Sequence, residues 1–340
     1  MLLEVNNLRT YFEGEGNDVK AVDGVSFAIE RGETVGLVGE SGSGKSVSGL
    51  TIMRLVPCPP GRIVGGEVRF EGVDLLQASP EQMRRVRGKE IAMIFQEPMT
   101  SLNPVLTIGR QISEILQRHL GVSRHDARAQ AVGLLKQVQI ANPEQRLSQY
   151  PHHLSGGMRQ RVMFAMALAC KPKLILADEP TTALDVTIQA QVLEMMSELS
   201  AKFGVAMILV THNLGVVARY ANRVHVMYAG KVVEKAPTRE LFENPRHPYT
   251  LGLLRSVPRP DLDPNRRLEP ISGSPPDLSE LPSGCSYHPR CPFATDLCRS
   301  REPVLTGVGA GHESACWYAG QLDVLAAGTA ADAGRPEGRR

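Results

Sequence analysis

The stretch Gly39–Ser46, with the sequence GESGSGKS, fits the pattern G-x-x-x-x-G-K-[ST] at every fixed position. The apolar run at 34–38 before it predicts a buried strand, and the run at 46–53 after it predicts a helix. In that order, the backbone N–H groups of the loop face one anion at the positive end of the helix dipole. The stretch therefore predicts a phosphate-binding loop in an α/β fold.

The residue types in this loop suit a nucleotide. Glycines let the backbone curl around phosphates, Lys45 reaches the β- and γ-phosphates, and the hydroxyl of Ser46 is placed to ligate Mg²⁺. The predicted nucleotide-binding residues of this region are Gly39, Glu40, Ser41, Gly42, Ser43, Gly44, Lys45, Ser46 and Val47.

Composition excludes some classes of protein. The chain has 340 residues, enough for two domains, and its 38 Lys and Arg against 36 Asp and Glu give a formal net charge of +2. This balance provides no basic field to attract nucleic acid, so we expect no nucleic-acid partner. The sequence shows no apolar run of about 18 residues and no basic-then-apolar leader, which predicts a cytoplasmic protein with reduced cysteines.

The apolar run 174–177 ends in two acids, Asp178 and Glu179. This pattern predicts a central parallel strand that presents carboxylates at its C-terminal edge. Asp178 can hold Mg²⁺ through a water, and Glu179 can accept a proton from the water that attacks the γ-phosphate, or orient it. Taken alone, the pair also fits a solvated strand end.

Two more polar side chains follow predicted strands. Gln96 follows the run 91–95, where its amide can face the metal and the attacking water, and His212 follows the run 205–211. Parallel strands bring both residues to the same sheet edge. Taken alone, Gln96 also fits a surface position and His212 a structural one.

Helical patterns fill the middle of the chain. Residues 107–145 carry apolar residues at helical spacing and predict an inserted helical subdomain. A later helix is predicted to begin after Ser155, its N-cap, with Gly156 and Gly157 in the first turn. Two glycines there are costly for a helix, which indicates that another group comes close to the backbone. A phosphate fits that position, and a plain loop is the alternative. Asp185 follows a turn near the start of the next helix.

Alternation of polar and apolar residues at 2–29 predicts short antiparallel strands. Phe12, at the end of the first strand, offers a flat face to adenine, although Tyr11 competes for that role and a core position fits Phe12 equally well. Residues 65–72 are predicted as a further edge strand, and 80–87 as a charged helix.

Six features, taken in order, resemble the ATP-binding-cassette (ABC) ATPases: the loop at 39–46, Gln96, the LSGG stretch at Ser155, the ADE strand end, the turn at Asp185 and His212. The resemblance covers about residues 1–240. It implies an α/β fold: a P-loop NTPase RecA-like core with an antiparallel β subdomain and an inserted helical subdomain at about 97–165.

This resemblance also implies a role for each motif residue. Lys45, Gln96, Glu179 and His212 would be catalytic, with Glu179 as the base and His212 on the γ-phosphate. The implied contacts are Phe12 at adenine, Lys45 on phosphates, Ser46, Gln96 and Asp178 at Mg²⁺, and Ser155, Gly156, Gly157 and Asp185 at the nucleotide.

One chain is not expected to complete the site. The motif groups cannot all converge on one phosphate within a monomer, so we expect hydrolysis in a sandwich of two ATPase subunits. The helix start at Ser155 of one subunit would then face the phosphates held by the other and stabilise the transition state through its N–H groups and dipole. The pair is either a homodimer or a heterodimer.

Two stretches narrow the resemblance to the oligopeptide, dipeptide and nickel importer branch: residues 96–104, QEPMTSLNP, and residues 241–250, LFENPRHPYT. This branch implies ATP-driven import of di- and oligopeptides, with two membrane permeases and an extracytoplasmic substrate-binding protein as partners. The chain would then lie at the cytoplasmic face of the inner membrane as a peripheral subunit. Import of nickel or another small solute is the alternative, and an ABC ATPase acting on nucleic acid or ribosomes is a third class.

Four of the six cysteines, Cys285, Cys291, Cys298 and Cys316, lie within 32 residues of one another in a predicted C-terminal segment at 241–318. Reduced thiols exclude disulfides in the cytoplasm, and the gaps of five, six and seventeen residues are wider than the paired spacing of zinc sites. Such gaps suit a [4Fe-4S] cluster, and the importer branch implies the same; zinc and unligated thiols are the alternatives. Residues 260–283 are predicted as a Pro-rich linker and 319–340 as a disordered tail.

Overall fold

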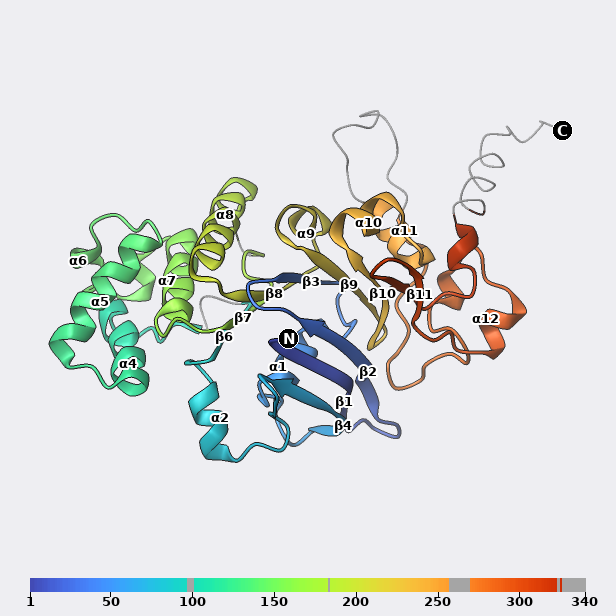
Figure 1. Ribbon diagram of the computed structural model, residues 1–340, viewed down its shortest axis with the longest axis horizontal. Coiled ribbons are helices and arrows are strands. Elements are labelled where there is room, and N and C mark those ends of the chain that lie inside the picture. Colours follow the sequence, from blue (N-terminus) through green and yellow to red (C-terminus); the bar gives the residue numbers. More distant parts are fainter. Residues whose placement is uncertain (97–100, 183, 257–269, 323–324, 326–340) are drawn as a thin grey trace.

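Strand β3 (Thr34–Val38) lies inside the main sheet, as its apolar run predicts. The computed structural model of the protein describes residues 1–96, 101–182, 184–256, 270–322 and 325 (Figure 1). The sheet has eight strands in the order β11-β12-β10-β9-β3-β8-β7-β6. Its parallel strands besides β3 are β6 (Ile91–Ile94), β7 (Leu174–Asp178), β8 (Ala206–Thr211) and β9 (Arg223–Tyr228).

A second, antiparallel sheet lies beside the main one (Figure 1). Its strands run in the order β2-β1-β4-β5, which confirms the antiparallel strands predicted at 2–29. The prediction of an edge strand at 65–72 was wrong, because β4 pairs with β1 on one side and with β5 on the other. The strands are β1 (Leu3–Phe12), β2 (Val19–Ile29), β4 (Gly61–Phe70) and β5 (Val73–Asp74).

Helices fill the predicted insertion. Ile108, Ile112 and Leu116 are fully buried, as their helical spacing predicts, and Thr107 caps the first of these helices by accepting a hydrogen bond from the Arg110 N–H. The group lies at one end of the molecule (Figure 1). Its helices are α4 (Ile108–Leu120), α5 (Arg124–Gln137) and α6 (Pro143–Arg146), preceded in the chain by α2 (Pro80–Val86).

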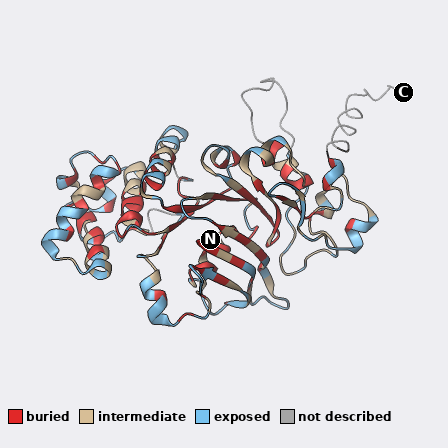
Figure 2. Cartoon of the chain, viewed as in Figure 1, coloured by how far each residue is buried: buried red, intermediate tan, exposed pale blue. Residues whose placement is uncertain are grey.

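The main sheet separates two hydrophobic cores. Its strands, at the centre of Figure 2, are largely buried. Along β7, Leu174 and Leu176 join the core shared with the antiparallel sheet, whereas Ile175 and Ala177 join the core on the helical side. This division follows from the period of two in a strand. The remaining α-helices before β9 are α1 (Lys45–Ile52), α7 (Gly156–Leu168), α8 (Val186–Phe203) and α9 (Leu214–Tyr220).

The C-terminal part extends the main sheet, which the sequence did not predict. Strand β12 pairs antiparallel with β10 through Glu234 opposite Ser314 and Lys235 opposite Glu313, and β11 pairs with β12. The elements of this part are β10 (Lys231–Pro237), α10 (Thr238–Glu243), α11 (Pro248–Arg255), α12 (Asp296–Ser300), β11 (Thr306–Gly309) and β12 (His312–Ser314).

A buried carboxylate joins this hairpin to the core. Glu234, in β10, is fully buried and lies 2.7 Å from the Nε2 atom of His312. It also accepts the backbone N–H of His247 at 3.0 Å. Since a buried carboxylate needs such partners, the three segments are held in one arrangement.

Several sequence predictions fall partly outside the described residues. Residues 97–100, which belong to the helical subdomain predicted at about 97–165 and to the QEPMTSLNP stretch at 96–104, lie outside them. Of the Pro-rich linker at 260–283, residues 260–269 lie outside them, as do 323–324 and 326–340 of the predicted tail. The tail prediction begins too early, because Ala319–Gln321 form a short 3₁₀ helix and Leu322 is buried. Within the described ranges, no helix is long and apolar enough to cross a membrane.

His225, in β9, gives the fold a pH dependence that can be measured. The ring is fully buried edge-on to Phe27, and neither nitrogen has a hydrogen-bond partner among the described residues. Burial, with smaller contributions from Arg223 and Lys235, lowers its pKa from 6.5 to about 3. The folded state therefore excludes a proton that the unfolded state binds below pH 6.5.

We predict that this histidine costs stability as the pH falls from 6.5 towards 3, by at most about 1.4 kcal/mol per pH unit. His225→Leu should flatten the pH dependence of the free energy of unfolding, measured by urea denaturation across this range. His152→Leu is the matched control, because His152 is exposed and should leave the slope unchanged. An equal slope in wild type and His225→Leu would contradict the prediction.

Candidate functional site

The loop Gly39–Ser46, here called the phosphate-binding loop, lies between β3 and α1, against the backbone of β9 and β2. A Cβ atom on Gly39 would lie 2.2 Å from the Met227 carbonyl oxygen, and one on Gly44 would lie 2.1 Å from that of Ala21. Both glycines also have positive φ, 154° and 99°. No other residue type fits these two positions, so the path of the loop requires the glycines of the motif.

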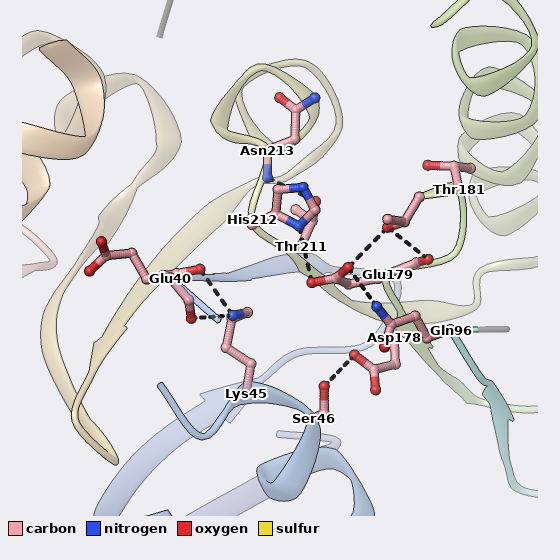
Figure 3. Close-up of polar contacts among 12 residues, drawn as sticks. Glu40, Lys45, Ser46, Gln96, Asp178, Glu179, Thr181, Thr211, His212 and Asn213 are labelled. Atoms are coloured by element: carbon pink, nitrogen blue, oxygen red, sulfur yellow. Dashed lines mark hydrogen bonds and ion pairs between the residues drawn. The ribbon is translucent and has the colours of Figure 1, made fainter. Parts of the chain in front are cut away.

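Lys45 is held inside the loop. Its Nζ atom donates to the carbonyl oxygens of Gly39 at 2.9 Å and Glu40 at 2.8 Å, and the side chain is buried (Figure 3). Burial lowers its pKa, while the nearby carboxylates of Glu179, Asp178 and Glu40 oppose that shift. The lysine is thus a buried cation that faces the acidic end of β7.

Ser46 and Asp178 meet as predicted for a shared metal. The hydroxyl of Ser46 donates to Oδ1 of Asp178 at 2.8 Å (Figure 3). Burial raises the pKa of Asp178, although the hydrogen bond from Ser46 opposes it. A hydroxyl and a carboxylate oxygen at one point are the hard donors that Mg²⁺ prefers, so the two residues fit that ion.

Glu179 is the most contacted carboxylate of the site. Its Oε2 accepts from Nε2 of Gln96 at 3.0 Å, and its Oε1 lies 3.1 Å from Nδ1 of His212 (Figure 3). Oε2 also accepts from the hydroxyl of Thr182 at 3.0 Å. Three residues from separate segments therefore contact one carboxylate. Two of these residues, Gln96 and His212, were expected at this sheet edge.

The environment of Glu179 favours its charged form. Burial acts to raise its pKa, but hydrogen bonds from His212 and Thr182 and the charges of His212 and Lys45 outweigh burial, so the pKa is lowered. Its backbone has a φ of 43°, a left-handed conformation that is uncommon for a residue with a side chain and that occurs at functional sites. The structure thus places an ionised carboxylate next to the end of β7.

The helix that starts after Ser155 packs directly on the helix that starts after Asp185. Ser155 caps α7 by accepting the Met158 N–H at 3.3 Å, and Asp185 caps α8 by accepting the Ile188 N–H at 3.0 Å. A Cβ atom on Gly157 would lie 2.6 Å from Cγ2 of Ile188. Close packing of the two helices therefore explains why a glycine is needed at position 157. The sequence interpretation considered only a phosphate near the backbone or a plain loop.

The aromatic candidates for adenine occupy different settings. The hydroxyl of Tyr11 donates to Oδ1 of Asp23 at 2.8 Å. Phe12 is half-buried at the end of β1, where its ring lies next to Gly61. Since Tyr11 has a structural partner, Phe12 stays the candidate for stacking on adenine.

Remaining loop positions differ in exposure. Ser41 and Gly42 are exposed, Ser43 is buried, and Val47 is half-buried against the core beneath the antiparallel sheet. The carbonyl oxygen of Ser43 accepts the N–H of Gly230 at 3.0 Å. The exposed residues Ser41 and Gly42 are thus followed by a buried residue, Ser43, that is hydrogen-bonded to Gly230.

Two contacts with Glu40 were not predicted. The guanidinium of Arg290 binds its carboxylate through two atom pairs, at 2.7 and 2.9 Å, and the hydroxyl of Tyr249 accepts its backbone N–H at 2.8 Å. Arg290 is 250 positions away in the sequence, so no local pattern could reveal the pair. Thr182 was missed for another reason: a threonine after a strand carries no distinct signal.

Cys285, Cys291, Cys298 and Cys316 all line one small, mainly apolar cavity, together with Phe293, Trp317 and Leu322. The backbone N–H of Tyr287 donates to the sulfur of Cys285, that of Phe293 to Cys291, and that of Tyr318 to Cys316. Burial raises the pKa of all three thiols, to about 12 for Cys291 and about 11 for Cys316. Across the described ranges, no three His, Cys, Asp or Glu side chains are grouped to hold a single metal ion.

Comparison with known families gives two matches. Residues 22–182 match the family described as "ABC transporter", and residues 233–298 match the "Oligopeptide/dipeptide transporter, C-terminal region". The second match covers most of β10, all of α11 and three of the four clustered cysteines.

Relatives match over most of the chain. The oligopeptide transport ATP-binding protein AppD of Bacillus subtilis is 54% identical over 93% of this chain and 96% of its own length. The dipeptide transport ATP-binding protein DppD of Escherichia coli is 50% identical over 98% and 99%. A probable peptide ABC transporter ATP-binding protein, y4tR of Sinorhizobium fredii, is 53% identical over 95% and 96%.

Solved structures agree on the fold. The ATP-binding cassette MJ0796, solved as a dimer in a post-hydrolysis state bound to ADP and Pi, has a TM-score of 0.63 and 27% identity over 70% of this chain and 99% of that one. Nearly all of the MJ0796 cassette is matched by 70% of this chain, so the remaining part of this chain has no counterpart in that structure.

Proposed function

The chain belongs to the ATP-binding subunits of ABC transporters, and we propose that it hydrolyses ATP to drive import of di- and oligopeptides through membrane permeases. One observation supports the assignment of ATP hydrolysis. The carboxyl edge of the parallel sheet brings together Lys45 of the loop, the Ser46–Asp178 pair, and Glu179 with Gln96 and His212. Polar side chains gathered there are the usual site of phosphate chemistry in α/β folds.

In the proposed reaction, a water attacks the γ-phosphorus of ATP and ADP leaves. Glu179 accepts the proton of that water, because the hydrogen bonds around it keep it ionised. Gln96 orients the water and His212 contacts the γ-phosphate, while Lys45 and the N–H groups of the loop bind the phosphate oxygens. Mg²⁺, held by Ser46, Gln96 and Asp178, would neutralise phosphate charge when bound.

A second ATPase subunit completes the site in this proposal. The N-terminus of α7 at Ser155–Gly157 would be presented to the nucleotide of the partner, where its N–H groups and dipole stabilise charge that develops on the γ-phosphate. The MJ0796 cassette, a structural neighbour, was solved as a dimer with ADP and Pi, which supports the arrangement.

We predict that Glu179→Gln binds ATP but hydrolyses it at least about 100-fold more slowly, because the amide cannot accept the proton. Binding is measured with a fluorescent ATP analogue, hydrolysis by phosphate release, and assembly by size exclusion, where the variant should accumulate as an ATP-bound dimer. Glu198→Gln, on the exposed face of α8, is the control. Wild-type turnover in Glu179→Gln would exclude Glu179 as the base.

The transport role rests on relatives and on the C-terminal region. Relatives that match over more than nine-tenths of the chain are named for oligopeptides or dipeptides, which supports peptides over nickel or another solute. Those names also argue against an ATPase of nucleic acid or ribosomes. The partners would be a second ABC ATPase, two permeases and an extracytoplasmic binding protein, with the chain bound peripherally at the cytoplasmic face of the membrane.

We predict that the chain co-purifies from detergent-solubilised membranes with two permeases and an ATPase subunit. Vesicles whose inner face carries the ATPase should accumulate labelled dipeptide only when ATP is enclosed inside them. Assemblies containing the Glu179→Gln variant should bind peptide without accumulating it. Purification with ribosomes or DNA and never with membranes would contradict the transport role.

The four clustered cysteines are proposed to hold a [4Fe-4S] cluster. Their shared apolar cavity and the N–H donors aimed at three of the sulfurs support bound thiolates, because such donors stabilise sulfur charge. A four-iron cluster separates its thiolates by several ångströms, so it does not need the tight grouping of a single-ion site. Its contribution would be structural, in a segment with little core of its own.

We predict about four iron and four acid-labile sulfide per chain after anaerobic purification, with visible charge-transfer absorption. Cys291→Ser should lower both contents and the absorbance, whereas Cys170→Ser, at a buried cysteine far from the clustered four in the sequence, should leave them unchanged. Stoichiometric zinc, or a colourless protein with no metal, would contradict the cluster.

A further inference from the structure

The phosphate-binding loop is fixed from outside by the cysteine segment, residues 285–316. Arg290 lies between Cys285 and Cys291, and its side chain is only 4% exposed. Its two terminal nitrogens bind the two carboxylate oxygens of Glu40 at 2.7 and 2.9 Å. A forked pair of this kind fixes both distance and orientation.

Every polar group of Glu40 is in use. Its carboxylate binds Arg290, its N–H donates to the Tyr249 hydroxyl at 2.8 Å, and its carbonyl accepts from Nζ of Lys45 at 2.8 Å. Glu40 thus links residues after the nucleotide core to the lysine that would bind the phosphates. Displacing Glu40 would move one of the two carbonyl oxygens that hold Lys45.

Arg290 is itself held rigidly. Its Nε donates to the Ser272 carbonyl at 3.0 Å, and the guanidinium lies 5.8 Å from the centre of the Tyr228 ring. The rings of Tyr228, Tyr249 and Tyr287 lie with centroids 4.6 to 5.4 Å apart, which packs β9, α11 and the cysteine segment together. The arginine is therefore a fixed support.

Backbone hydrogen bonds tie the turn that carries this support to two of the clustered cysteines. The N–H of His288 donates to the Cys285 carbonyl at 2.9 Å, and the N–H of Cys285 donates to the Cys298 carbonyl at 2.8 Å. The backbone N–H of Arg290 donates to the Tyr287 carbonyl at 3.0 Å. The short helix His288–Arg290 thus lies directly between two of the clustered cysteines.

We propose that Arg290 is a positioning residue for the phosphate-binding loop, acting through Glu40, so that the cysteine segment sets the affinity of the ATPase for nucleotide. The inference rests on the proposed ATP site. Linkage makes the effect reciprocal: nucleotide that binds the loop must also favour the ordered arrangement of the cysteine segment.

The test compares Arg290→Ala, Arg290→Lys, Glu40→Gln and the double variant Glu40→Gln/Arg290→Ala in the full chain. Arg290→Ala and Glu40→Gln should each weaken binding of a fluorescent ATP analogue about tenfold and raise KM, with little change in kcat at saturating ATP. The double variant should be no weaker than either single one, because both remove the same contact. Arg290→Lys keeps the charge without the fork and should be intermediate.

Arg299→Ala is the matched control, since Arg299 lies in the same segment, is 57% exposed and pairs only locally with Asp296. Hydrogen exchange provides a readout that a merely structural role would not give: a non-hydrolysable ATP analogue should slow exchange at 285–291 in wild type and not in Arg290→Ala. Glu40→Gln leaves the cysteine segment untouched, so it tests the link even where Arg290→Ala folds poorly.

Two outcomes distinguish failure of this inference from failure of the proposed ATPase function. A wild-type chain that binds no ATP would overturn the proposed function and the inference together. Normal wild-type binding with unchanged affinity in Arg290→Ala or in Glu40→Gln would overturn the inference alone.

Discussion

The site depends on the parallel pairing of β3 with β8 and β9, which holds the phosphate-binding loop against its neighbours. The loop leaves β3 at Val38 and lies so close to the Met227 and Ala21 carbonyls that side chains at Gly39 and Gly44 would overlap them. Because β7 pairs with β8, its carboxyl end lies at the same edge. Backbone pairing, more than any side-chain contact, thus decides which groups meet there.

The acids at the end of β7 experience different environments although they are adjacent. Burial raises the pKa of Asp178, which suits a ligand that becomes fully charged beside a cation, whereas three hydrogen-bonding partners surround Glu179, whose pKa is lowered. The left-handed backbone at Glu179 separates the two side chains at the strand end. One short turn therefore provides two carboxylates with different roles.

The sequence predicts most of the core and its site, because the relevant residues follow strands of strong apolar character. The loop, Asp178, Glu179, Gln96 and His212 each lie next to a short apolar run, and the order of such runs is readable locally. The Arg290–Glu40 pair, the Tyr249 contact and the hairpin on β10 depend on residues far apart in sequence. No periodicity in the sequence predicts such pairings. The pairing of β4 with β5 was missed as well, because β5 has only two residues.

The hairpin β11–β12 has a further effect on how molecules behave in solution. It covers β10, a seven-residue strand with Val232 and Val233 buried, and leaves the four-residue β11 as the outermost strand. β11 contains two glycines and a register shift, which makes it a poor template for pairing with another chain. Truncation after α11 would uncover the backbone groups of β10, and a shortened protein would then be prone to aggregate through that strand.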